Sequence, residues 1–212
     1  MDDGYLTIAQ RASFEFSEKH SRFIGCCAAV ADEGEALEFI TCVKESHRTA
    51  SHNVWAYLLR EQNLCRYTDD GEPKGTAGLP VLDVLKGFGA VDAAVVVTRY
   101  FGGTLLGTGG LVRAYSQAAR MALTNAGVAE MALCARLSLE CSYSDYDRVV
   151  RLLESVGASV KSEFLDSVEM TLLVRERDVQ TVTGKLCEFT GGRIIPRLIE
   201  KHFEKVGGQK RI

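Results

Sequence analysis

Hydrophobic and polar residues alternate in the first part of the chain with the period of β-strands. Phe14 and Phe16 alternate with polar neighbours, and residues 23–30 form an apolar run after the polar residues 18–20. This pattern predicts a β-hairpin. Further strands are predicted at the apolar segments 53–59, 64–68 and 93–100.

Three helices are predicted between and after these strands. Asp32 and Glu35 resemble a capping box, and apolar residues then recur at helical spacing. A short helix is predicted over 79–88. A long helix is predicted over 108–126, with Thr108 as its N-cap residue and a glycine after its end.

The last part of the chain shows a second, complete pattern that begins just after residues 131–133. Alternation predicts strands at 137–141 and 168–174, and we expect Ser144 and Asp178 to cap the two helices. The remaining strands are predicted at 160–164 and 194–203. The resulting order βαββαβ is that of the ferredoxin-like split motif.

These patterns together predict an α+β protein with two domains of unequal size. We expect an N-terminal domain over residues 1–132, a ferredoxin-like domain over 133–204 and a polar tail over 205–212.

Composition narrows the functional classes. The 212 residues carry a net charge of −3, so a polycationic nucleic-acid binder is excluded and any nucleic-acid contact must use a local patch. No apolar run is long enough to span a membrane, and the acidic start differs from a signal peptide. We therefore expect no membrane partner and a cytoplasmic location. The seven cysteines are scattered without a C-x-x-C pair, which predicts reduced core thiols.

A glycine-rich segment joins the apolar strand at 93–100 to the long helix. It contains five glycines between Gly102 and Gly110, and Arg113 follows in the first turns of the helix. Backbone N–H groups at such a junction can hold a phosphate or a carboxylate, although glycines also serve tight turns that bind nothing. The Walker loop does not fit, because Thr108 stands where lysine is required. The dinucleotide fingerprint fails because Val112 occupies its last glycine position.

Other polar residues suggest chemistry less specifically. Asp69, Asp70 and Glu72 could hold a cation, yet acids in a Gly/Pro turn commonly bind nearby backbone N–H groups. His52 could contact a phosphate or serve as a base, or it could simply be a satisfied histidine at a domain edge. No hydrolase triad, metal-ligand spacing or cofactor motif is found, so no metal and no cofactor is expected.

Two arginines near the glycine segment are better placed for a ligand. Arg99 and Arg113 could grip a phosphate from both sides of the glycine loop, while the ring of Tyr100 stacks on a base. The alternative for Arg99 is an ion pair with an acid such as Asp70. The residues alone leave this choice open.

Several of these segments, in this order, resemble the YigZ/IMPACT family. The matching motifs are SRFIG at 21–25, ASHNVWAY at 50–57, DGEPKGTAGLP at 70–80, RYFGG at 99–103 and GTGGLVRAY at 107–115. Since the bacterial branch of that family carries a ferredoxin-like second domain, the resemblance extends to nearly the whole chain. One departure is Leu105, which stands where many relatives place a polar or basic residue.

The resemblance implies a fold for each domain and a link to translation. The first domain is expected to be a βαβ domain like those of a small-subunit ribosomal protein, of domain IV of elongation factor G and of certain small-molecule kinases. The second is expected to resemble the ferredoxin-like modules of elongation factor G. Eukaryotic relatives are translational regulators, and the bacterial branch is associated with nucleic-acid binding. A shared fold alone is a weak argument for function.

We therefore expect a translation-associated regulator that is not an enzyme and that binds RNA, a ribosome-associated surface or a protein partner through the glycine-loop face. The alternatives are an enzyme that binds a small phosphate compound with the same loop, and a pure protein-interaction module. The expected nucleic-acid or phosphate-binding residues are His52, Asp70, Glu72, Lys74, Thr76, Arg99, Tyr100, Gly102, Gly103, Gly107, Thr108, Gly110 and Arg113.

Overall fold

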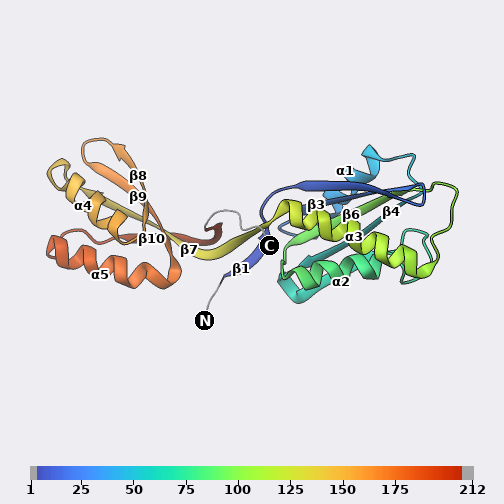
Figure 1. Ribbon diagram of the computed structural model, residues 1–212. Helices are drawn as coiled ribbons and strands as arrows, with labels where there is room; N and C mark the ends of the chain where they lie inside the picture. The colour runs from blue at the N-terminus through green and yellow to red at the C-terminus, as the bar shows by residue number, and fades with distance from the viewer. Residues whose placement is uncertain (1–3, 207–212) are drawn as a thin grey trace. The chain divides into compact units, whose positions relative to one another are not determined.

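The computed structural model describes residues 4–206, which divide into two compact units (Figure 1). We call residues 5–130 the N-terminal unit and residues 131–206 the C-terminal unit. Strand β7 (Val128–Cys141) begins in the first unit and continues into the second. Of the tail predicted at 205–212, residues 207–212 lie outside the described part of the chain.

The N-terminal unit is built on an antiparallel sheet with the strand order β2-β3-β6-β4-β5. Its strands are β2 (Ala12–Glu18), β3 (Ser21–Ala29), β4 (His52–Leu59), β5 (Leu64–Thr68) and β6 (Ala93–Tyr100). The predicted hairpin of β2 and β3 is confirmed, as are the strands after it. The central strand β6 is buried along almost its whole length, which explains its continuous apolar sequence.

Helices cover both faces of this sheet. Helix α1 (Glu33–Ser46) lies on one face, and α2 (Gly78–Phe88) and α3 (Thr108–Ala126) lie on the other (Figure 1). The alternate residues of β4 and β6 therefore enter two cores. Tyr57 and Val96 pack under α1, whereas Val54 and Val97 pack under α2 and α3.

The C-terminal unit has the predicted order βαββαβ. Its elements are β7, α4 (Tyr143–Ser155), β8 (Ser159–Phe164), β9 (Val168–Arg175), α5 (Val179–Thr190) and β10 (Arg197–Lys205). Strand β7 pairs with β9 and with β10, and β8 pairs with β9, all antiparallel. The short strand β1 (Tyr5–Ile8), which belongs to the N-terminal unit, neighbours β7 in the strand order. The described residues also form two short 3-10 helices, η1 (Glu61–Asn63) in the N-terminal unit and η2 (Glu176–Asp178) in the C-terminal unit.

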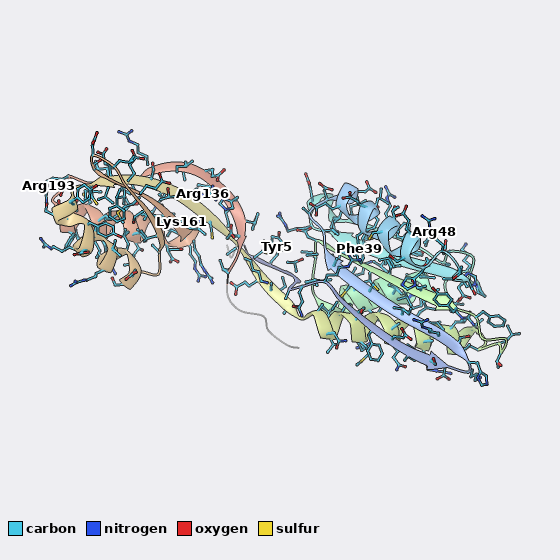
Figure 2. The ribbon with its side chains drawn as sticks, turned by 90° about the horizontal axis from the view of Figure 1, so that it is seen from above. Tyr5, Phe39, Arg48, Arg136, Lys161 and Arg193 are labelled. Carbon is cyan, nitrogen blue, oxygen red and sulfur yellow. The ribbon has the colours of Figure 1, made fainter. Side chains whose placement is uncertain are left out.

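One face of this second sheet is covered by α4 and α5. Val149 and Leu153 of α4, with Val182 and Leu186 of α5, form a core with the inward residues of the strands. The alternate positions carry polar side chains such as Arg136 and Lys161 (Figure 2), which lie outside that core. The α+β fold class predicted from the sequence is thus confirmed. In residues 4–206, no helix is long and apolar enough to span a membrane.

Helix starts were predicted with mixed success. Asp32 caps α1 as expected, because its side chain accepts from the N–H of Glu35. The N-cap of α3 is Gly107 rather than Thr108, and the N-cap of α4 is Ser142 rather than Ser144. Asp178 occupies the N-cap position of α5, but its side chain makes no capping hydrogen bond. A local pattern therefore finds a helix better than it finds the residue that begins it.

The cysteines are free, but the prediction that all are core thiols is wrong. Cys27, Cys134 and Cys141 are buried and Cys26 is partly buried, whereas the thiols of Cys42, Cys65 and Cys187 are exposed. Burial raises the pKa of the Cys27 thiol to about 12. This thiol therefore stays protonated near neutral pH, where only the thiolate is nucleophilic.

The first testable consequence concerns Gly25 in β3. A Cβ atom here would overlap the carbonyl oxygen of Ala118 in α3, so helix and strand must separate in the variant Gly25→Ala. We expect a loss of about 1–3 kcal/mol in the free energy of unfolding, measured by urea denaturation. The control Gly87→Ala, in α2 with open space around it, should be neutral or slightly stabilising. Equal stability of the Gly25→Ala variant and the wild type would contradict the close contact.

A second consequence concerns thiol reactivity at pH 8. Three cysteines should react rapidly with a chromogenic disulfide reagent, namely the exposed Cys42, Cys65 and Cys187. Cys27 should react only after unfolding, because burial keeps its pKa far above the pH of the assay. The variant Cys42→Ser should remove one rapid equivalent. A rapid equivalent assigned to Cys27 by peptide mapping would be inconsistent with its burial.

Candidate functional site

The predicted site residues gather at one end of the N-terminal sheet. Strand β6 ends there at Tyr100, β3 begins there at Ser21, and β4 begins there at His52. The antiparallel register aligns Arg99 of β6 with both Phe23 and His52. We call the four segments 18–21, 47–52, 69–77 and 101–107 the loop end.

A buried ion pair lies at the centre of the loop end. The Nη1 atom of Arg99 donates to Glu72 Oε1 at 2.6 Å, and the Tyr115 hydroxyl donates to the same oxygen at 2.7 Å. Arg99 is 4% exposed and Glu72 is 8% exposed. The Oγ atom of Ser21 accepts from Arg99 Nη2 and from the N–H of Gly102, each at 3.3 Å. The pair thus joins β6, the 69–77 segment, α3 and β3.

Two groups next to the Arg99–Glu72 pair, the Tyr115 hydroxyl and the His52 ring, carry the protons that their hydrogen bonds require. Burial raises the pKa of the Tyr115 hydroxyl, and the hydrogen bond to Glu72 raises it further, so the phenol remains a donor. His52 Nδ1 lies 2.8 Å from the carbonyl oxygen of Asp70, which can only accept, so Nδ1 carries a proton. The other ring nitrogen of His52 lies 3.8 Å from Glu72 Oε1.

Two acids of the same segment are bound by backbone N–H groups. Asp69 accepts from the N–H groups of Gly75, Ala77 and Gly78, which closes the loop and caps the start of α2. Asp70 accepts from the N–H of Asn53 at 2.6 Å. Within residues 4–206, no group of three or more acidic, His or Cys side chains is arranged to hold a metal ion.

These contacts decide what the residues alone left open. Glu72 and Thr76 of the Gly/Pro turn are buried. Arg99 does form an ion pair, but with Glu72 rather than with Asp70. The Oδ1 atom of Asp70 instead lies 3.6 Å from Lys44 Nζ. Desolvation explains the choice, because a buried guanidinium requires a counterion at the same depth.

The start of α3, which directly follows the loop end, is accessible to solvent. Gly107 is its N-cap residue, with a φ of 74°, and within the described residues no side-chain hydrogen bond caps the helix. The next residues, Thr108 and Gly109, are exposed. Arg113, one turn further, is also exposed and has no ion-pair partner within the described part of the chain. Backbone N–H donors and a guanidinium therefore face solvent on one helix end.

The thirteen predicted site residues differ widely in exposure. The exposed ones are Lys74, Gly103, Gly107, Thr108 and Arg113. The partly buried ones are His52, Asp70, Tyr100, Gly102 and Gly110, and the buried ones are Glu72, Thr76 and Arg99. Among them, direct contacts join Glu72 with Arg99 and place His52 against both Asp70 and Glu72. The Tyr100 hydroxyl lies 2.9 Å from His47 Nδ1, outside that cluster.

Three residues that organise the site were not predicted from the sequence as site residues. Ser21 and Tyr115 bind the Arg99–Glu72 pair, and Asp69 caps α2. For Tyr115 a signal exists, because a hydroxyl on the buried face of a helix usually has a hydrogen-bond partner. Asp69 precedes its cap position by eight residues, beyond any capping motif.

Comparison with known proteins finds relatives that match both units. The family model described as Impact N-terminal domain matches residues 19–123, and one described as domain of unknown function (DUF1949) matches residues 139–193. A crystal structure described as that of an hypothetical protein aligns with a TM-score of 0.63 at 30% identity, covering 94% of this chain and 99% of that one.

Curated bacterial relatives match over most of their length. The protein described as IMPACT family member YvyE, from Bacillus subtilis (strain 168), is 36% identical over 191 residues, which is 89% of this chain and 88% of that protein. An IMPACT family member from Haemophilus influenzae is 32% identical and covers 92% of this chain and 97% of its own length. IMPACT family member YigZ of Escherichia coli (strain K12) is also 32% identical, over 86% of this chain and 92% of that protein.

The buried ion pair gives a testable prediction about stability. The variant Glu72→Gln leaves the Arg99 guanidinium buried without a counterion, and we expect it to lose about 3 kcal/mol in the free energy of unfolding. Combining it with Arg99→Met should cost less than the sum of the single changes, because the double variant has no uncompensated charge. Denaturant unfolding of all four proteins measures this coupling.

An exposed pair provides the control for that experiment. Glu15→Gln breaks the Arg22–Glu15 pair, whose side chains are about half exposed, and should change stability little. If Glu72→Gln lowered the free energy of unfolding as little as Glu15→Gln does, the buried pair would not organise the loop end.

Proposed function

The chain belongs to the IMPACT family, and we propose that it acts in translation without catalysing a reaction, by binding RNA phosphates at the loop end of its N-terminal unit. The family resemblance implies the link to translation. The glycine-loop face and its cations supply the chemistry for RNA.

The observation that carries the proposal is the uncapped start of α3 beside a solvent-exposed guanidinium. The first N–H groups of a helix lack partners within the helix, and the helix dipole favours an anion there. Among residues 4–206, no side-chain hydrogen bond caps the start of α3, and Arg113 is exposed one turn away. A guanidinium binds phosphate oxygens in a bidentate manner, so the two features suit one phosphate group.

The local charge also favours a polyanion, although the chain carries a net charge of −3. Of the four acids of the loop end, Asp69, Asp70 and Glu72 are engaged by donors of the protein itself, whereas Glu18 is exposed. The exposed cations of the same end are Lys19, Lys74, Arg48 (labelled in Figure 2) and Arg113. A phosphate backbone approaching this end therefore meets cations, while most of the nearby carboxylate charge is compensated.

Arg99 has a different role in this proposal from the one expected from its sequence position. Its guanidinium is buried against Glu72, so it does not face a ligand. We assign it to holding the loops, and we assign the phosphate contact to Arg113 and the N–H groups of Thr108, Gly109 and Gly110. A small phosphate compound is the alternative ligand for these donors.

The test measures RNA binding by fluorescence anisotropy across a series of salt concentrations. Arg113→Ala should weaken binding of every RNA sequence to a similar extent. It should also lower the slope of log K against log salt by about 0.7 to 1 for the lost phosphate contact. Thermal unfolding should be unchanged, because Arg113 is exposed.

The matched control is Arg120→Ala, which removes an exposed arginine from the same helix two turns further from its start. It should leave both the affinity and the salt slope unchanged. Identical effects of the two variants would argue against a specific phosphate site at the start of α3. Full competition by inorganic phosphate or a nucleotide at low concentration would favour the small-molecule alternative.

A further inference from the structure

Phe101 is an exposed aromatic residue at the loop end whose backbone is held in place. The residue directly follows β6, and its side chain is 47% exposed. Its N–H donates to Ser51 Oγ at 3.0 Å, and the next N–H, of Gly102, donates to Ser21 Oγ at 3.3 Å. A Cβ on Gly102 would overlap the backbone of His20, so the chain here packs directly on the turn between β2 and β3. The backbone that carries the ring is therefore fixed on both sides.

The ring of Phe101 is also held, by the buried guanidinium of Arg99. The Cζ atom of Arg99 lies 5.3 Å from the centroid of the Phe101 ring and 5.5 Å from that of Phe23. The Nε atom of Arg99 is buried and has no hydrogen-bond partner within residues 4–206. Attraction between the cation and these two ring faces compensates part of that missing hydrogen bond. Through Arg99, the Glu72 carboxylate thus indirectly positions the Phe101 ring.

Core packing does not account for this ring. Phe101 belongs to none of the apolar clusters of the described residues, whereas Phe23, whose ring contacts the same guanidinium, is fully buried. Phe101 is the first residue of the seven-residue loop 101–107, which ends where α3 begins. A solvent-exposed aromatic ring therefore lies at the start of the loop that leads to the proposed phosphate-binding donors of α3.

We propose that the exposed face of Phe101 is a stacking platform for an unpaired base, so that the loop end selects single-stranded RNA over duplex RNA. This inference rests on the proposed function, because the phosphate contact at α3 brings the chain of nucleotides to the ring. Bases in a duplex are already stacked on each other and cannot cover the ring, whereas those of a single strand can. Arg99 and Glu72 act as positioning residues that hold the platform.

The test compares two synthetic single-stranded RNAs of equal length, one with its bases and one in which the central nucleotides are abasic. Both carry the same phosphates, so a site that reads only the backbone binds them equally. The wild type should prefer the base-bearing strand by about tenfold, the fold-change that corresponds to roughly 1.4 kcal/mol of base stacking. The readout is fluorescence anisotropy at fixed salt, with an RNA duplex as the third ligand.

Two substitutions at the ring assign that preference to Phe101. Phe101→Leu keeps an apolar side chain but removes the aromatic face, and it should bind both strands equally and with the affinity that the wild type has for the abasic strand. Phe101→Trp keeps the aromatic face and should retain the preference, with quenching of its indole fluorescence on binding. Leu105→Ala, at an exposed apolar residue of the same loop, serves as the matched control and should behave as the wild type.

The outcomes separate this inference from the proposed function. If the wild type binds both strands equally and Arg113→Ala still weakens that binding, stacking on Phe101 is wrong while the phosphate site stands. Stacking on Phe101 is equally wrong if Phe101→Leu keeps the wild-type preference for the base-bearing strand. If the wild type binds neither strand nor the duplex at low salt, both the stacking platform and the RNA function fail, and a protein partner becomes the occupant to seek for Phe101.

Discussion

The ion pair between Arg99 and Glu72 is the interaction on which the loop end depends. Both groups lose water when they are buried, and their mutual attraction offsets that loss only because the remaining donors and acceptors are also engaged. Tyr115 and Ser21 supply those contacts from α3 and β3. Segments far apart in the sequence are therefore joined through one buried carboxylate and its guanidinium partner.

In the loop end, some charged groups are bound within the protein, whereas others are exposed to solvent. Asp69 caps α2 and Glu72 compensates Arg99, so neither carboxylate opposes a polyanion at full strength. Because Asp69 accepts from the N–H groups of Ala77 and Gly78, the start of α2 is already capped, whereas no side-chain hydrogen bond within the described residues caps the start of α3. Arg113 and Phe101 are exposed beside this buried network and are the groups that we propose for ligand contact.

Periodicity was a good guide to the elements and a poor guide to their ends. The strands and helices of both units follow from apolar spacing, because burial on one face imposes that spacing on the residues themselves. The caps depend on backbone angles that the spacing does not encode. Gly107 begins α3 because the chain needs a φ of 74° at that position, which favours glycine over Thr108. Ser142 and Ser144 are chemically equal candidates, and only the path of the chain selects the first.

The sequence by itself determined the α+β class, the βαββαβ order of the C-terminal unit and the family, because these depend on residue types at local spacings. It also identified the segments of the candidate site. Only the tertiary structure decided the role of each side chain, turning Arg99 inward to Glu72 and leaving Arg113 and Phe101 exposed. The reason is physical: burial and ion pairing depend on which distant segments meet, and the partners of Arg99 are 27 and 78 residues away along the chain.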